Sequence, residues 1–257
     1  DSNFTIFDEK DSRKLVKNII SQMPGEGKKP ASYQSKISRL KNKTVFYEDV
    51  KNNKASVDSD VAHVYIQYQE HLQKMNGVDF DDLLLQTLRL FKEYPDVLRI
   101  YQDFWKYLLI DEYQDTNKCQ YLISSLIAGA HKNICVTGDP DQSIYSWRGA
   151  DIRNILDFEK DFPGAKIIRL EQNYRSTKKI LRAATKVIKN NDQRKDKGLW
   201  CDGPEGDLIN LVEEFTPEEE ADRISEIIEK QVSQNPDSAE IAVFYRTNAQ
   251  SRLIEQA

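Results

Sequence analysis

The chain has 257 residues, of which 42 are acidic and 37 are basic, so its formal net charge is −5. Its apolar residues form no run long enough to span a membrane, and its N-terminus lacks the pattern of a secretory signal. Three widely spaced cysteines, Cys119, Cys135 and Cys201, argue against a disulfide framework and against a cysteine-based zinc site.

Positive charge is concentrated in two segments of this acidic chain. Residues 13–54 contain 11 Lys and Arg against 3 Asp and Glu, and residues 178–197 contain 8 against 2. Basic segments are usually solvated faces, and the overall charge argues weakly against a dedicated nucleic-acid-binding protein. The two segments flank a candidate phosphate site in the sequence. Binding of an anionic ligand by these segments is therefore an open alternative.

Helical patterns dominate the N-terminal part of the chain. Residues 11–23 begin with a plausible capping residue, and residues 24–27 end that helix. Its apolar side contains Leu15, Ile19 and Ile20. A later helix has apolar residues at helical spacing, namely Val61, Val64, Tyr65, Tyr68 and Leu72. We therefore expect residues 1–75 to be mainly helical.

A new helix is predicted to begin at Asp79. Residues 79–82 place acidic side chains in its first turn, where the helix dipole stabilises negative charge. Its buried face is expected to contain Leu83, Leu84, Leu88 and Phe91. Pro95 is expected to end it, because the residue before a proline disfavours helical geometry.

Strand and helix patterns alternate in the next part of the chain. Strands are predicted over residues 107–110, 133–137 and 166–170, with a helix over residues 117–129. Such alternation is typical of an α/β fold with a parallel sheet.

The pattern restarts near residues 165–172, which indicates a second α/β unit. Helices are predicted over residues 176–190 and 217–234, and strands over residues 207–215 and 241–245. Thr216 and Glu219 are spaced as a capping box, with Pro217 at the first helical position.

Two of the predicted strands end in acidic or amide side chains. The apolar residues 108–110 lead directly into Asp111 and Glu112, and residues 134–137 lead into a segment that contains Gln142. Adjacent parallel strands deliver such groups to one sheet edge, which is how phosphoryl-transfer sites are built. Asp111 can hold Mg²⁺, Glu112 can take a proton from water, and Gln142 can respond to a terminal phosphate.

Aromatic and arginine side chains follow these strand ends. Tyr145, Trp147 and Arg148 lie in a polar segment, where exposed rings can stack on bases and an arginine can hold a phosphate. The alternative is that the rings anchor the core, which their polar neighbours disfavour. Farther along, Arg175 can act as an arginine finger and Tyr174 can cover an adenine, unless both belong to an ordinary loop before a helix.

Four of these segments, in order, resemble motifs of the UvrD/Rep/PcrA group of superfamily-one DNA helicases. Motifs II, III, IV and IVa resemble residues 111–117, 138–150, 171–177 and 244–252. The helix start at residues 79–83 also matches, and residues 1–75 are similar to most of the helical 1B subdomain of the group.

The resemblance implies partial RecA-like α/β domains and a division of the chain into three. Residues 1–75 would be a 1B-like subdomain, residues 76–168 the C-terminal part of the first RecA-like domain, and residues 169–257 the N-terminal part of the second. The implied ligands are ATP, Mg²⁺, single-stranded DNA and duplex DNA. The implied activity is 3′–5′ translocation and unwinding in DNA repair or replication, in the bacterial cytoplasm.

The resemblance also implies roles for individual residues. Asp111 would coordinate Mg²⁺, Glu112 would act as general base, and Gln142 would couple the γ-phosphate to the DNA site. Arg175 would be an arginine finger, and Tyr174 would stack on the base of ATP. The residues implied to grip single-stranded DNA are Tyr145, Trp147 and Arg148, with help from Phe80 and Arg246.

The sequence has no G-x-x-x-x-G-K-[ST] phosphate loop, and residues 25–29 match it only in part. In the group this loop precedes the 1B region, so we expect it before Asp1, and we expect motifs V and VI after Ala257. The chain would then be an internal segment of a longer helicase, inactive as an ATPase by itself. Sheet edges left open would favour self-association.

Other classes of protein remain open. A helicase-like subunit of a helicase–nuclease shares motifs II to IV, and a non-catalytic module could bind single-stranded DNA through the same aromatic residues. A metal-dependent nuclease could use the acidic residues Asp111, Glu112, Asp115, Asp139 and Asp141. The nuclease leaves Trp147 and Arg175 without a role.

Overall fold

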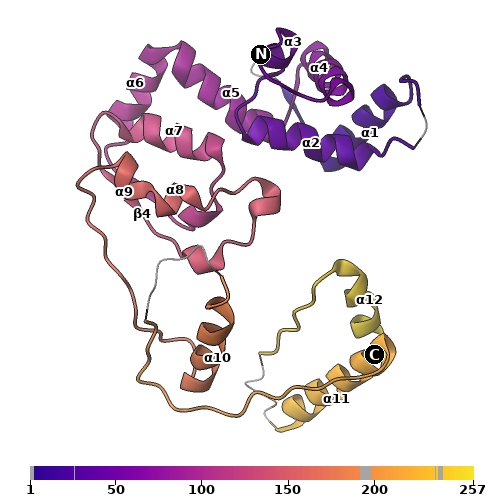
Figure 1. The fold of residues 1–257 in the computed structure, drawn as a ribbon, viewed down its shortest axis with the longest axis vertical. Helices are drawn as coiled ribbons and strands as arrows, with labels where there is room; N and C mark the ends of the chain where they lie inside the picture. Colours follow the sequence, from indigo (N-terminus) through magenta and orange to yellow (C-terminus); the bar gives the residue numbers. More distant parts are fainter. Residues whose placement is uncertain (1–2, 26, 192–197, 235, 237–239) are drawn as a thin grey trace. The chain divides into compact units, whose positions relative to one another are not determined.

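The computed structural model describes residues 3–25, 27–191, 198–234, 236 and 240–257 of the chain (Figure 1). Two compact units are present. The first contains Asp1–Leu170 with Ile188–Gly198, and the second contains Glu171–Val187 with Leu199–Ala257. Residues 192–197 of the second basic segment lie outside the described residues.

Four helices and one short strand form the N-terminal part of the first unit. They are β1 (Thr5–Phe7), α1 (Glu9–Ile20), α2 (Pro30–Asn42), α3 (Tyr47–Lys51) and α4 (Ser59–Lys74). Helix α1 begins earlier than predicted because the Asp8 side chain accepts hydrogen bonds from the N–H groups of Lys10 and Asp11. The helices enclose an apolar core of Val16, Ile19, Ile20, Ile37, Val50, Val64, Tyr65, Tyr68 and Leu72.

The predicted helix after Asp79 is confirmed as α5 (Phe80–Glu93). Strand β2 (Gly77–Asp79) leads into it and pairs in parallel with β1. On its apolar face Leu88 and Phe91 are buried as predicted, but Leu83 and Leu84 are only half-buried and Leu85 takes the buried position. Pro95 ends α5 as predicted, and it also occupies the first turn of a helix that was not predicted, α6 (Pro95–Phe104).

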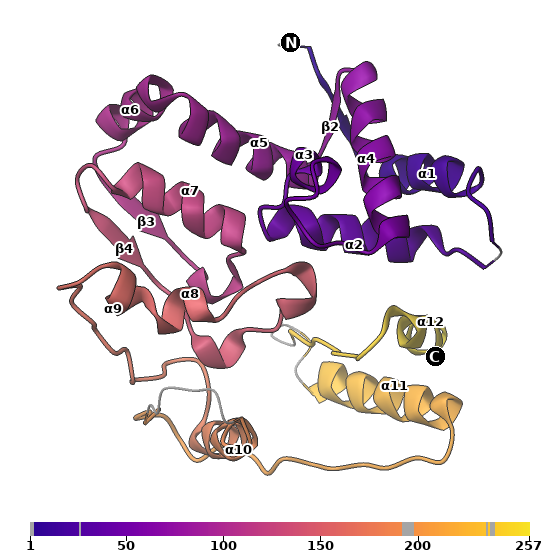
Figure 2. The same cartoon turned by 45° about the horizontal axis from the view of Figure 1, so that its top comes forward.

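The predicted parallel pair is also confirmed. Strands β3 (Leu108–Ile110) and β4 (Ile134–Val136) pair in parallel, with Leu109 opposite Cys135. Helix α7 (Lys118–Ala128), capped by Asn117, connects them. Figure 2 shows the pair between α7 and the short helices α8 (Arg153–Leu156) and α9 (Phe158–Asp161).

Helices α10 (Lys178–Ile188), α11 (Pro217–Gln234) and α12 (Asn248–Gln256) form the regular structure of the C-terminal part. The predicted capping box of α11 is confirmed, because the Glu219 N–H donates to Thr216 Oγ1 and the Thr216 N–H donates to Glu219 Oε2. None of the helices in the described residues is both long and apolar enough to cross a bilayer.

Three predicted strands are wrong. Residues 166–170, 207–215 and 241–245 have no strand structure, although all of them belong to the described part of the chain. Their apolar side chains are largely exposed, as at Leu170, Leu211 and Phe244. A strand exists only where its backbone pairs with another strand, and the described residues offer these segments no such partner.

A buried lysine connects the helical part to the start of α5. The Lys41 side chain is fully buried, and its Nζ lies 2.6 Å from Asp79 Oδ2 and 2.8 Å from Asp82 Oδ1. Asp79 also accepts a hydrogen bond from Tyr68, at 2.9 Å, and Asp82 accepts two from Gln69, each at 3.1 Å. A single ammonium group therefore compensates two carboxyl groups that also cap α5.

The two carboxyl groups respond oppositely to this environment. Burial would raise the pKa of Asp79, but the Lys41 ammonium and the hydrogen bonds of Asp79 hold that pKa below its ordinary value. For Asp82, burial outweighs the attraction of Lys41 and raises the pKa of the carboxyl group.

Replacing Lys41 with Met should destabilise the first unit by about 3–5 kcal/mol, because Asp79 and Asp82 would be left buried without a counter-charge. Urea unfolding followed by circular dichroism measures the change. The matched control is Lys43→Met on the exposed side chain two residues later, which should cost about 0.5 kcal/mol or less. Equal stability of the two variants would contradict the role assigned to Lys41.

Candidate functional site

The chain turns sharply where β3 delivers its two acidic residues. Glu112 has a left-handed backbone conformation, with φ of 50° and ψ of 41°, and its N–H donates to Asp111 Oδ1 at 2.9 Å. This conformation is uncommon for a residue with a side chain and costs about 1 kcal/mol or more. The turn leads into a short 3₁₀ helix, Tyr113–Asp115, and leaves both carboxylates exposed at the end of the strand.

Gln114 connects this turn to the end of β4. The side chain is 1% exposed, its Nε2 donates to Glu112 Oε2 at 2.7 Å, and its Oε1 accepts from the Asp139 N–H at 2.9 Å. A Cβ at Gly138 would lie 2.5 Å from Gln114 Oε1, so only glycine allows this close passage. Gln114 was not assigned a role from the sequence, because no local pattern shows which backbone group a distant amide will bind.

The hydrogen bonds that run from Glu112 through Gln114 to Asp139 continue to a second predicted site residue. Gln142 lies in the 3₁₀ helix Pro140–Gln142, and its Nε2 donates to Asp139 Oδ2 at 2.9 Å. Glu112 and Gln142 are therefore joined through Gln114 and Asp139. The structure brings these two predicted residues together at the carboxyl end of the β3–β4 pair, as expected for neighbouring parallel strands.

The acidic residues at this edge suit a hard cation that is held partly by another ligand. Magnesium is usually bound through one or two carboxylates together with substrate phosphates, and the exposed carboxylate of Asp111 meets that requirement. Burial and the nearby charge of Glu112 raise the pKa of Asp115. Among the described residues, no three His, Cys, Asp or Glu side chains form a metal-binding cluster.

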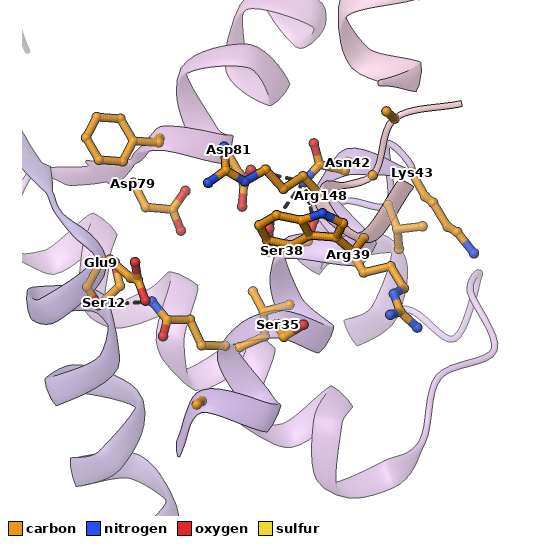
Figure 3. A pocket seen from close by; sticks show the side chains of 18 of the residues that line it. Glu9, Ser12, Ser35, Ser38, Arg39, Asn42, Lys43, Asp79, Asp81 and Arg148 are labelled. Atoms are coloured by element: carbon orange, nitrogen blue, oxygen red, sulfur yellow. Dashed lines mark hydrogen bonds between the residues drawn. The ribbon is translucent and has the colours of Figure 1, made fainter. Parts of the chain in front are cut away.

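A cleft of about 1300 Å³ lies in the first unit, between the helical part and the segment that follows β4 (Figure 3). Its walls come from α1, α2, the starts of α5 and α7, and residues 146–153. Its cationic residues are Arg13, Arg39, Lys43, Lys118, Arg148 and Arg153. Its acidic residues are Asp8, Glu9, Asp79, Asp81 and Asp151. The balance is close to neutral, although the chain as a whole is acidic.

The aromatic residues predicted to contact bases lie in or beside this cleft. Phe80 and Trp147 line it and are 62% and 68% exposed. The guanidinium of Arg148 lies 4.6 Å from the centroid of Trp147 and 5.4 Å from that of Tyr145. Exposed rings next to a cation are suited to bases and phosphates, and the alternative that Tyr145 and Trp147 are core anchors is wrong.

Backbone contacts hold this segment in place. Ala150 forms an antiparallel bridge with Asn117, and the Asp151 N–H donates to the carbonyl of Thr116 at 3.0 Å. Gly149 has φ of 92°, which favours glycine. The segment with Trp147 is therefore fixed to the start of α7 directly after the acidic turn.

Three further predicted site residues belong to the second unit. Tyr174 is 85% exposed, and its hydroxyl donates to Gln172 Oε1 at 2.7 Å. Arg175 and Arg246 also have exposed side chains. The convergence of Arg175 with Glu112 and Gln142 around one triphosphate stays a prediction, as do the contacts of Tyr174 with ATP and of Arg246 with DNA.

Replacing Gln114 with Ala should destabilise the chain by about 1–3 kcal/mol, because the partly buried Asp139 N–H would lose the Gln114 carbonyl as its acceptor. Amide hydrogen exchange at Asp139, followed by NMR, should become faster. Gln142→Ala is the matched control. It removes an exposed amide that donates to the side chain of Asp139 and leaves the acceptor of the Asp139 N–H in place. Unchanged amide exchange at Asp139 in the Gln114 variant would contradict the hydrogen bond from the Asp139 N–H to Gln114.

Comparison with known proteins agrees with this geometry. The UvrD/REP helicase N-terminal domain matches residues 1–163, and the UvrD-like helicase C-terminal domain matches residues 168–257. Proteins named ATP-dependent DNA helicase PcrA from Staphylococcus epidermidis and Staphylococcus aureus are each 46% identical to the chain over 257 residues. The match covers 99% of this chain but 35% of each relative. The chain therefore belongs to the UvrD/REP helicase family.

Proposed function

We propose that these residues are part of an ATP-dependent DNA helicase that moves 3′–5′ along single-stranded DNA and unwinds duplex DNA in repair or replication. The observation that carries the proposal is the hydrogen-bonded path from Glu112 through Gln114 and Asp139 to Gln142. This path links the acidic strand end to the loop that continues into Trp147. A bacterial cytoplasmic location belongs to the same proposal.

Glu112 is the proposed general base for ATP hydrolysis. Its carboxylate is exposed at the strand end, and Gln114 holds one of its oxygens. The other oxygen can then accept a proton from the attacking water. Asp111 would hold Mg²⁺, which when bound neutralises charge on the phosphates. Gln142 would respond to the terminal phosphate, and Arg175 would add positive charge there as the arginine finger, with Tyr174 against the adenine.

The cleft of the first unit is the proposed site for single-stranded DNA. Phe80 and Trp147 present exposed rings for base stacking, with Tyr145 beside them, and Arg148 supplies a cation for a phosphate. Arg246 is proposed to add a further contact from the second unit. Because the cleft lies within the first unit, a non-catalytic module that binds single-stranded DNA is the second candidate function.

Self-association through the edges of the β3–β4 pair is also proposed. The pair has two strands, and Leu109 on β3 is 77% exposed. Exposed strand edges with apolar neighbours favour pairing with another chain.

In the protein that contains this chain, Glu112→Gln should lower DNA-stimulated ATP hydrolysis at least about 100-fold, because the amide cannot accept the proton from water. A coupled ATPase assay measures turnover, and binding of a fluorescent ATP analogue should persist. The control is Asp103→Asn, an exposed acid at the end of α6, which should leave turnover unchanged. Full activity of the Glu112 variant would exclude it as the base.

Trp147→Ala should weaken binding of a labelled oligothymidylate at least about fivefold, because one stacking platform is lost. Fluorescence anisotropy of the labelled strand measures the affinity. Trp105→Ala is the matched control, since that ring is also partly exposed but does not line the cleft. Binding that is insensitive to Trp147, or equally sensitive to Trp105, would argue against the cleft as the DNA site.

A further inference from the structure

Asn42, the last residue of α2, uses its whole side-chain amide in hydrogen bonds at the base of the cleft (Figure 3). Its Nδ2 donates to Asp81 Oδ1 at 3.0 Å, and to the carbonyl and hydroxyl oxygens of Ser38 at 2.8 and 3.2 Å. Its Oδ1 accepts from Asn117 Nδ2 at 2.5 Å. Asn42 is 7% exposed, and its hydrogen bond with Asn117 is buried.

The two long-range partners of Asn42 belong to different walls of the cleft. Asp81 lies in the first turn of α5, directly after Phe80. Asn117 caps α7 and forms the backbone bridge to Ala150, in the segment with Trp147 and Arg148. One amide group therefore links the element that carries one exposed ring to the element that supports the other.

A packing contact reinforces this link. A Cβ placed on Gly149 would lie 3.1 Å from the Cβ of Asn42, which is tighter than an ordinary contact. The backbone just after Arg148 thus packs directly against Asn42. A shift of Asn42 would be felt on both sides of the cleft, at Phe80 and at Trp147.

We propose that Asn42 is a positioning residue that sets the spacing between Phe80 and Trp147 for stacking on a single nucleic-acid strand. The inference rests on the proposed function of the cleft. Asn42 acts through Asp81 and Asn117 and needs no contact with the strand itself. The helical part of the chain would then contribute to DNA affinity by its geometry.

The neighbouring Lys41 has a different role. Its ammonium contacts Asp79 and Asp82, which cap α5, and within the described part of the chain it has no hydrogen bond or ion pair to the segment with Trp147. Loss of Lys41 should therefore reduce stability first. Loss of Asn42 should reduce affinity for single-stranded DNA in the folded protein, because it releases both walls.

The test compares binding of labelled oligothymidylate by anisotropy in two backgrounds, the intact chain and a Phe80→Ala/Trp147→Ala variant. Asn42→Ala should weaken binding about tenfold in the intact chain and less than about twofold in the variant, since contacting groups that act together are not additive. Asn52→Ala, on an exposed asparagine after α3, is the matched control and should change neither. Equal losses in both backgrounds would show that Asn42 acts only on folding and would overturn the proposal.

A polarity exchange covers the case in which Asn42→Ala does not fold. Asn42→Asp places a carboxylate against Asp81 and should weaken binding. The double variant Asn42→Asp/Asp81→Asn restores a donor and an acceptor between these two positions and should recover part of the binding, although the Ser38 carbonyl still lacks its donor. Failure of the second change to recover binding would overturn the proposal. Absence of binding by the intact chain would instead refute the proposed function of the cleft.

Discussion

The contact of the Lys41 ammonium with two buried carboxylates is the constraint from which the arrangement of the first unit follows. A buried charge must be paired, so Asp79 and Asp82 can lie in the interior only where Lys41 reaches them. Tyr68 of α4 donates to Asp79 and also lies 2.9 Å from the Ser12 hydroxyl on α1. Helices α1, α2 and α4 thus meet at the start of α5. Asn42, which follows Lys41 on α2, is thereby placed at the base of the cleft.

Both candidate functional regions of the first unit are held by buried side-chain amides. Gln114 joins a carboxylate to a backbone N–H, and Asn42 joins a carboxylate to the amide of Asn117. An amide has a donor and an acceptor on one rigid group, so it can satisfy one partner of each kind. A carboxylate could not donate to Glu112 or Asp81 at neutral pH. The residue type therefore follows from the mixture of partners.

The charge of the whole chain is a poor guide to the charge of the cleft. The net charge is −5, yet the cleft gathers cations from α1, α2 and the segment after β4. The acidic residues of the cleft include Asp79, which faces Lys41, and Asp151, which pairs with Arg153. Arg39 on α2 and Lys43 directly after it also line the cleft. Ion pairs between neighbouring side chains determine the sign of the charge that a ligand meets in the cleft. The net charge of the sequence does not contain this information.

The sequence by itself determined the features that depend on neighbouring residues. The helix start at Asp79, the capping box at Thr216 and the two apolar runs that form β3 and β4 could all be predicted, because helix starts and strand periodicity are local. The order of the motif segments in the sequence also identified the family.

Tertiary structure alone decided which strand-like segments pair and which amides bridge distant loops. Residues 207–215 have a strand pattern but no strand partner among the described residues, because pairing is a property of two segments and periodicity a property of one. The partners of Asn42 lie 39 and 75 residues away. No local rule predicts such a contact, since the chain must first fold to bring its donor and acceptor within hydrogen-bonding distance.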